Sequence, residues 1–398
     1  MLWLLACAGP GHDSVPIPQT TCERLEAPVG TEDVSVAPID GLDSTWSEEY
    51  DNGYTSFELI YRSGSGIGPV YIHETCAACH AGASRGPKTV TKMVVMDGEE
   101  PAEDQSALPW GHTERPEVGG GATTPISVPD DVEGLLVSER QPPAVFGRGY
   151  LEAVADEEIE RVEAEQAAGG VVSGRINRLD WSAVEADSPF HDHVPGDTNL
   201  IGRFGLKARI VTLDEFAADA LQGDMSITSP LRPDELPNPD GLTDDYRDGV
   251  DTTTDRVNRT ADYTRLLAIP ARGDDAGADV FDALGCATCH VPTLHTRTDY
   301  PVAPLADIDA PIYTDLLLHD MGPEMSDGLA DGDAEPSEWR TSPLIGLRFL
   351  GPLLHDGRAE SPEEAIAAHG GEAASARDAY AAASDTDRAA LCSFLAGL

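Results

Sequence analysis

Two short segments of the chain share one arrangement of reactive side chains. Residues 76–80 (CAACH) and 286–290 (CATCH) both have the pattern Cys-x-x-Cys-His. Thiols at i and i+3 of a helical turn can form thioethers to the two vinyl groups of a haem, and the adjacent imidazole then reaches the iron. A zinc site would leave the repeated histidine unexplained, and a redox dithiol needs a βαβ context that is absent here. We therefore predict two covalently bound haem c groups, held by Cys76, Cys79, Cys286 and Cys289, with His80 and His290 as proximal ligands.

The other cysteines bear on the compartment. Cys7 ends the run Leu4-Leu5-Ala6-Cys7, which looks like a bacterial lipobox, although a merely hydrophobic terminus is the alternative. Haem attachment of this kind takes place outside the cytoplasm. We therefore expect a periplasmic or cell-envelope protein in which residues 1–45 are a lipoprotein signal and tether, and which meets the membrane only through a lipid anchor. Cys22 and Cys392 either form a disulfide or remain two unpaired thiols.

The charge of the chain restricts its partners. There are 71 acidic residues against 26 basic ones, which gives a formal net charge of −45 at pH 7. A polyanion of this kind repels nucleic acid and anionic membrane surfaces, so we exclude both as partners. An electron donor that docks by electrostatics should instead be a small basic redox protein such as a cytochrome. Calcium is a further candidate cofactor that suits the acidity, although no specific calcium loop is apparent.

The pattern of apolar and capping residues predicts mostly helices. We expect helices at 152–167, 212–222, 274–285, 361–368 and 384–397. Short strands are expected near 90–96 and 207–212, and surface loops at 97–131, 228–259 and 298–311. The predicted fold is therefore mainly α, with two cytochrome c-like helical haem domains and long loops. The first domain would span 46–270 with insertions, and the second 271–398.

Three longer stretches carry a family resemblance: Arg140–Val154, Gly202–Pro230 and Asp315–Glu372. Over about residues 55–398 the chain resembles the di-haem oxidoreductases, the thiol-oxidoreductase-like branch of the bacterial di-haem cytochrome c peroxidase superfamily. The resemblance implies two helical haem domains that face each other and exchange electrons. It also implies hydrogen peroxide and an electron-donor protein as typical substrates.

The resemblance suggests roles for individual residues. The sixth ligand of the second haem falls fourteen residues after His355, at His369, although a histidine near a helix end often serves only the helix dipole. A bis-histidine haem should be low-spin and of lower potential than one with methionine. At the first haem, Asp224 takes the place of a catalytic glutamate, or it is simply a turn acid. His112 is a candidate removable sixth ligand there, or an exposed loop residue.

Three arginines, Arg209, Arg340 and Arg358, are candidates for pairing with haem propionates, with ordinary surface salt bridges as the alternative. The tryptophan that relays electrons in many relatives is replaced by Leu206, so we do not expect fast hopping through a side chain. The leading hypothesis is a peroxidase-like enzyme that reduces peroxide at the first haem with electrons relayed by the second. The alternatives are a non-catalytic electron-transfer cytochrome and an oxygen-using or protein-modifying enzyme.

Overall fold

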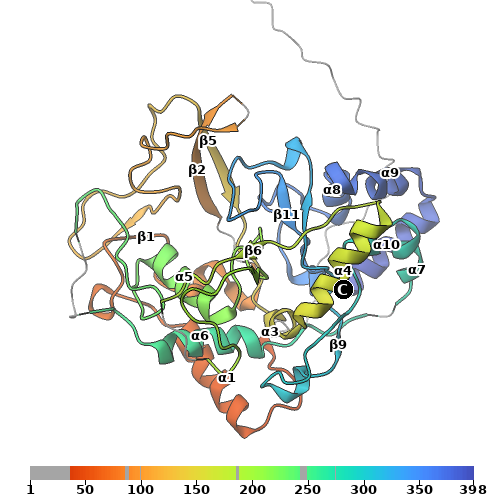
Figure 1. Cartoon of the computed structure of the whole chain (residues 1–398), viewed down its shortest axis with the longest axis horizontal. Coiled ribbons are helices and arrows are strands. Elements are labelled where there is room, and N and C mark those ends of the chain that lie inside the picture. The colour runs from red at the N-terminus through yellow and green to blue at the C-terminus, as the bar shows by residue number, and fades with distance from the viewer. Residues whose placement is uncertain (1–35, 86–88, 99, 185–187, 243–248, 274) are drawn as a thin grey trace, which may run out of the picture.

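The computed structural model describes residues 36–85, 89–98, 100–184, 188–242, 249–273 and 275–398 (Figure 1). The prediction of a mainly α fold is wrong, because only 34% of the structure is helical and 14% lies in strands, as several small sheets. Three of the strands, at Glu100–Pro101, Glu117–Val118 and Asp309–Ala310, lie in predicted loops, and most of the others lie where no element was predicted. A two-residue strand needs no run of alternating residues, so such pairs leave no pattern in the sequence. Cys7 and Cys22 lie outside the described residues, and so does the proposed disulfide.

The helices gather in two groups (Figure 1). The α-helices are α1 (Ser44–Phe57), α2 (Cys76–Cys79), α3 (Arg148–Ala153), α4 (Asp156–Gly169), α5 (Leu213–Met225), α6 (Thr254–Leu266), α7 (Ala278–Ala283), α8 (Pro362–Ala367), α9 (Ala374–Ala382) and α10 (Asp385–Gly397). Short 3₁₀ turns occur at Ser63–Ser65, Ala81–Ala83, Cys286–Thr288, Ala303–Leu305, Pro323–Met325, Leu347–Phe349 and Gly371–Ala373. No helix among these described segments is long and apolar enough to cross a membrane.

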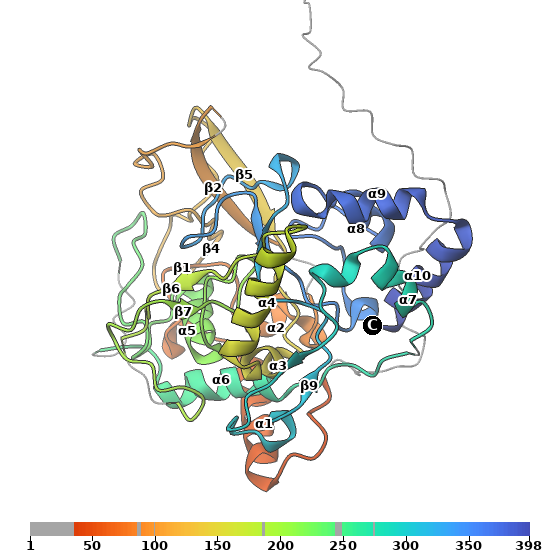
Figure 2. The ribbon, with the colours of Figure 1, turned by 45° about the vertical axis from the view of Figure 1, so that its right-hand side comes forward.

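The strands form small antiparallel sheets. They are β1 (Val70–Tyr71), β2 (Val90–Asp97), β3 (Glu100–Pro101), β4 (Glu117–Val118), β5 (Leu135–Arg140), β6 (Arg178–Leu179), β7 (Leu200–Ile201), β8 (Leu294–His295), β9 (Asp309–Ala310), β10 (Leu318–Asp320) and β11 (Glu338–Arg340). The largest sheet has the order β3-β2-β5, with Val90 opposite Arg140 and Val95 opposite Leu135. The remaining pairs are β1-β4, β6-β7, β8-β9 and β10-β11. The sheet of β2 and β5 stands out from the helical body in both views (Figures 1 and 2).

The first helical group packs around α6, which contacts α1, α3 and α5. The second group, α7 to α10, has its own apolar core, which includes Phe281, Tyr313, Tyr380, Leu391 and Phe394. Helix α4 lies between the two groups (Figure 2). Its buried residues Ile159 and Val162 share one cluster with Leu213 of α5 and with Leu316 and Leu317 of the later chain. This cluster therefore packs α4 against the first helical group and against the segment at 316–317.

Capping residues explain where the predicted helices begin. Thr212 accepts a hydrogen bond from the backbone N–H of Glu215 at 3.3 Å, and Ser361 accepts one from Glu364 at 3.2 Å. The five predicted helices correspond to α4, α5, α7, α8 and α10, and the strand near 90–96 to β2. The strand near 207–212 is not formed, apart from one bridge between Phe204 and Ile210. Helix α6 begins inside the stretch that was predicted to be a surface loop at 228–259.

A buried ionic network explains why α6 was missed. Arg265 is only 1% exposed and donates to Glu152 of α3 at 2.6 Å, and it also pairs with Asp262 and with Asp214 of α5. Glu152 in addition accepts from the hydroxyl of Tyr300 at 2.7 Å and from the backbone N–H of Leu213 at 2.8 Å. In the sequence these charged residues are typical of a solvent-exposed loop. In the structure they are buried and join α3, α5 and α6.

The close approach of α3 to α6 requires a glycine. A Cβ atom at Gly149 would lie only 2.0 Å from the carbonyl oxygen of Arg265. A larger residue there would separate the two helices and lengthen the contact between Glu152 and Arg265. The glycine and the ion pair therefore support the same packing.

We predict that Arg265→Leu lowers the free energy of unfolding by about 3–5 kcal/mol, because it leaves buried carboxylates without a cation. The measurement is chemical denaturation at neutral pH. Arg161→Leu is the control, since Arg161 is exposed and pairs only with Glu158 and Glu165 on its own helix. Equal stabilities of the two variants would contradict the assignment.

Candidate functional site

The first Cys-x-x-Cys-His motif forms one helical turn. Helix α2 contains Cys76 and Cys79, and the backbone N–H of His80 donates to the carbonyl oxygen of Cys76 at 3.0 Å. The two thiols and the imidazole therefore come from a single compact turn, as the spacing predicts.

A cavity lies beside this turn. Its walls come from α2, the segment 142–145, α3, α5 and α6, and they include Phe57, Ile72, His73, Cys76, Cys79, His80, Pro143, Val145, Arg148, Leu213, Phe216, Ala217, Leu221 and Asp224. Burial lowers the pKa of His80 to about 4, so its imidazole is neutral at pH 7 and can act as a metal ligand. The wall is otherwise mostly apolar, with α5 supplying a run of aliphatic and aromatic side chains.

Helix α5 is fixed at both ends, and this places Asp224 in the cavity wall. At its beginning, the backbone N–H of Leu213 is bound by Glu152. At its end, the carbonyl oxygen of Asp224 accepts from the backbone N–H of Ile72 at 2.7 Å, and Ser226 Oγ donates to the carbonyl oxygen of Val70 at 2.6 Å. The segment just before the motif is thus tied directly to the last turn of α5.

The carboxyl group of Asp224 has an altered acidity. Burial raises its pKa to about 6, and the nearby charge of Asp219 adds to this, whereas Lys92 and Arg209 oppose it. Lys92 comes from β2, and its Nζ donates to Thr113 Oγ1 at 2.6 Å. Burial lowers the pKa of Lys92 to about 8. A carboxyl group with a pKa near neutrality, in the wall of a cavity that also contains the neutral His80, is suited to proton transfer.

The second motif is paired with the predicted distal histidine. The rings of His290 and His369 have centroids 6.5 Å apart. His290 Nδ1 lies 3.2 Å from the carbonyl oxygen of Tyr313, and His369 Nδ1 lies 2.7 Å from that of Ala365. Each Nδ1–H therefore donates to a carbonyl, which leaves each Nε2 as an acceptor. Burial lowers the pKa of His290 to about 4 and also lowers that of His369, so both are neutral, as metal-ligating imidazoles must be.

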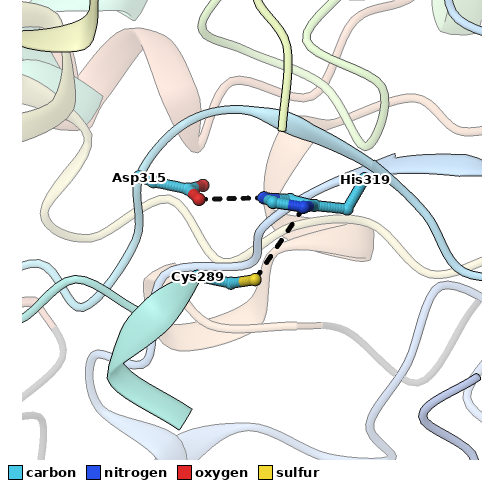
Figure 3. A group of neighbouring side chains, drawn as sticks. All are labelled: Cys289, Asp315 and His319. Carbon is cyan, nitrogen blue, oxygen red and sulfur yellow. Dashed lines mark hydrogen bonds and ion pairs between the residues drawn. The ribbon is translucent and has the colours of Figure 1, made fainter. Parts of the chain in front are cut away.

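A charged network holds the second motif in place (Figure 3). Cys289, Asp315 and His319 have ligand atoms within 4.8 Å of one another. His319 donates to Asp315 at 2.9 Å and to Glu372 at 2.8 Å. Burial alone would lower the pKa of His319, but hydrogen bonds to Asp315, Cys289 and Glu372 raise it to about 12, so it is an imidazolium. Glu372 lies three residues after His369 and thereby ties the distal segment to the motif.

The remaining predicted site residues, three arginines and His112, differ in their burial and in their partners. Arg209 pairs with Asp219, and the exposed Arg358 pairs with Asp356, so each already has a carboxylate partner. Arg340 is 6% exposed and donates only to backbone carbonyls, those of Gly205 at 3.1 Å and Thr341 at 2.9 Å. His112 is exposed, its Nδ1 lies 2.9 Å from the carbonyl oxygen of Met93, and it is not among the described residues that line the first cavity.

Two further residues reach the first site without having been predicted. His73 lines the cavity, three residues before Cys76, and Lys92 approaches Asp224 from β2. The position of His73 directly before the motif is a signal that the sequence offers. No such signal exists for Lys92, because its approach depends on how the β2-β5 sheet packs. Leu206, at the position of the relay tryptophan, accepts a backbone hydrogen bond from Arg340 at 2.9 Å.

Comparison with known proteins now decides the family. Residues 127–398 match the model of a family described as "Di-haem oxidoreductase, putative peroxidase". The chain belongs to this di-haem oxidoreductase family. The match contains the second motif and Asp224, whereas the first motif at 76–80 precedes it.

Two other comparisons add little. No protein of curated function matches the chain. Among solved structures, hydrazine synthase of Kuenenia stuttgartiensis is similar at a TM-score of 0.36 and 12% identity, with all of both chains covered. That score is too low to support an argument about fold or function.

The residues of both sites fit the haem groups that a di-haem family implies. Each motif offers two thiols and a neutral imidazole, and in the second site a second neutral imidazole lies with its ring centroid 6.5 Å from that of His290. A second metal is less well supported. The one cluster of potential ligands found among the described residues contains a thiol and an imidazole, whereas calcium prefers oxygen ligands.

We predict that His319→Gln destabilises the protein by about 3–5 kcal/mol, because it leaves the fully buried Asp315 without a cation. The control is His295→Gln, since the exposed His295 between Asp307 and Asp309 should make no measurable contribution. Denaturant unfolding of both variants is the measurement, and a loss of similar size in the control would contradict the prediction.

The same network predicts a pH dependence. Ion pairing and hydrogen bonds to His319 and Ser173 lower the pKa of Glu372 from 4.5 to about 2. Its stabilisation is therefore complete above pH 4.5 and is lost as the pH falls toward 2. In this range the stability of the wild-type protein should fall more steeply than that of Glu372→Gln. Parallel curves would show that Glu372 is not held as an ion.

Proposed function

We propose that this member of the di-haem oxidoreductase family is a c-type peroxidase of the cell envelope. Hydrogen peroxide would be reduced at the first site, next to His80. Electrons would arrive from a small basic redox protein and pass through the second site, at His290 and His369. The observation that carries the proposal is the position of Asp224 in the wall of the first cavity.

The two sites differ in a way that supports a division of labour. In the second site the ring centroid of His369 lies 6.5 Å from that of His290, and its imidazole would occupy the remaining coordination position of the iron. In the first site, α5 instead lines the cavity with Phe216, Ala217, Leu221 and Asp224. A closed site suits electron transfer, whereas a cavity with one acidic group suits a small reactant.

A bound haem would supply an iron that changes its oxidation state and binds the oxidant. The chain must supply the proton transfer. Cleavage of a peroxide requires a proton to move from one oxygen to the other, and a carboxylate within hydrogen-bonding distance can carry it. With a pKa of about 6, Asp224 is largely ionised at pH 7 and accepts the proton, and it is still acidic enough to return it.

The neighbouring charges hold this acidity in a useful range. Lys92 and Arg115 favour the ionised form of Asp224, and burial and Asp219 favour the protonated form. Phe216 stacks with the buried Phe204 at a centroid distance of 6.2 Å, which keeps this side of the cavity apolar. A low local dielectric strengthens the interaction of the carboxylate with the reactant.

The net charge of −45 supports a basic electron donor. Opposite charges accelerate encounter, and salt screens the attraction, so the rate of reduction should fall as ionic strength rises. The envelope location and lipid anchor remain part of the proposal, and they rest on the motif chemistry and on Cys7.

One observation favours the alternative of a non-catalytic electron-transfer cytochrome. His73 also lines the first cavity and could close the iron from within it. Paramagnetic resonance of the oxidised and half-reduced protein, followed by peroxide addition, separates the two functions. Two low-spin haems that ignore peroxide in both states would exclude the peroxidase.

We predict that Asp224→Asn slows peroxide turnover by about 10²–10⁴-fold with little change in the absorption spectrum, because only the proton carrier is removed. Stopped-flow mixing of the half-reduced protein with peroxide measures the rate. The wild-type rate should rise with pH through about 6, as Asp224 ionises. This rise should be absent in Asp224→Asn and present in Asp234→Asn, a control at an exposed position. An unchanged rate in Asp224→Asn would remove Asp224 from the mechanism.

We also predict that His369→Ala converts the second haem from low-spin to high-spin, because the strong-field imidazole is lost. Absorption and paramagnetic resonance spectra of the oxidised protein report the change. Replacement of the exposed His112 by Ala should leave the second haem as it is. A low-spin second haem in His369→Ala would show that another residue is the ligand.

A further inference from the structure

Three arginines, one of which lines the first cavity, have no acidic partner among the described residues. Arg148 is 8% exposed and Arg340 is 6% exposed, while Arg85 is half-buried. Arg148 Nε donates to the carbonyl oxygen of Ala144 at 2.6 Å, and Arg85 donates to that of Pro352 at 2.7 Å. Arg340 likewise reaches only the carbonyl oxygens described above. None of the three forms an ion pair with a carboxylate of the described residues.

Other buried arginines in the chain behave differently. Arg140 pairs with Asp327 and Asp331, and Arg265 pairs with Glu152. With 71 acidic residues available, unpaired buried guanidinium groups are not a result of scarcity. A buried charge without a counterion is costly, since the carbonyl dipoles that it meets do not cancel it. The missing partner should therefore be an anion that the described residues do not provide.

The three side chains are close enough to sense one another. Burial lowers the pKa of Arg148 to about 9, and the charges of Arg340 and Arg85 add to this effect. Burial also lowers the pKa of Arg340 and of Arg85 to about 10. The three like charges thus lie near one another. Arg340 also donates to Gly205, the residue after Phe204, and the ring of Phe204 stacks on Phe216 in the cavity wall. An anion with more than one negative charge would relieve both the burial and the mutual repulsion.

The position of the cluster identifies the anion. Arg148 lines the same cavity as Cys76, Cys79 and His80, and Arg85 follows His80 by five residues. Among the described residues Arg148 hydrogen-bonds only through Nε, so its two terminal nitrogens can bind a group in the cavity that it lines. A haem attached to Cys76 and Cys79 carries two propionate carboxylates. Guanidinium groups bind carboxylates through paired, parallel hydrogen bonds.

We propose that Arg85, Arg148 and Arg340 bind the propionates of the haem attached to Cys76 and Cys79. The inference rests on the proposed c-type haem of the first site, and it deepens that proposal by naming the residues that neutralise the haem's acidic edge. Of the three arginines that the sequence suggested for this role, the proposal keeps Arg340. It leaves out Arg209 and Arg358, because both are already paired with carboxylates.

The cluster would also connect distant parts of the chain. Arg148 opens α3, Arg340 lies in β11, and Arg85 hydrogen-bonds to the segment at Pro352. Propionates held by all three would join the region of the first motif to the region that follows the second. Binding of the first haem would then stabilise the contact between them.

The test compares Arg148→Gln, Arg340→Gln and Arg148→Lys with wild type, each produced with its haems attached. Arg161→Gln is the matched control, since it removes one arginine charge from an exposed helix. Two readouts are used: the resonance Raman bending band of the haem propionates, and the midpoint potential of each haem by spectroelectrochemical titration.

Both glutamine variants should shift the propionate band and lower the potential of the first haem, because loss of a nearby cation favours the ferric state. Arg148→Lys should retain most of the potential, since the charge remains, and Arg161→Gln should match wild type. Unshifted bands and potentials in both glutamine variants would overturn the proposal, and so would shifts confined to the second haem. If Arg148→Gln fails to load haem, Arg340→Gln and Arg148→Lys decide the outcome by the same criteria.

These outcomes are separable from those of the proposed function. Wild-type protein that is loaded with haem but ignores peroxide would overturn the peroxidase and leave the arginine proposal intact. Loaded protein that reduces peroxide, with a propionate band and haem potentials unchanged in both Arg148→Gln and Arg340→Gln, would overturn the arginine proposal alone.

Discussion

The pairing of Arg265 with Glu152 is the interaction on which the first site depends. A buried guanidinium needs carboxylates, and those that it finds come from α3 and from the first turn of α5. Glu152 also binds the backbone at the start of α5, so the helix that lines the cavity cannot move without breaking this network. The other end of α5 is tied to the segment before Cys76. The distance between the motif and Asp224 is therefore set by two contacts at opposite ends of one helix.

The two sites solve the same chemical problem with different surroundings. In both, burial keeps the histidine of the motif, His80 or His290, neutral, and in the second a backbone carbonyl fixes which nitrogen remains an acceptor. The second site adds an imidazolium between two carboxylates, so each of these charged groups has a partner within the protein. The first site contains an acid with a raised pKa on one side and arginines without acids on the other. The charge balance of the first site therefore depends on the anion that we propose for these arginines.

The sequence predicted those features that are local. The motifs, the capped helices and the spacing from His355 to His369 all depend on nearby residues, and the structure brings His290 and His369 together as expected. It could not predict α6, because Asp262 and Arg265 look exposed until their partners from α3 and α5 are known. It also could not separate Arg340 from Arg209 and Arg358, since their burial and their carboxylate partners depend on the tertiary structure. The fold class was wrong for the same reason: β2 finds its partner β5 only after an excursion of the chain.

The chain between β2 and β5 affects the first site through Lys92. Lys92 reaches Asp224 from a sheet that stands apart from the helical body, while His80, His290 and His369 belong to other segments. A change in the length or packing of residues 97–131 would move the ammonium group and leave α5 and both motifs in place. The pKa of Asp224 can thus be adjusted independently of the histidines that we propose as iron ligands. Relatives with different excursions could share one electron pathway and yet work best at different acidities.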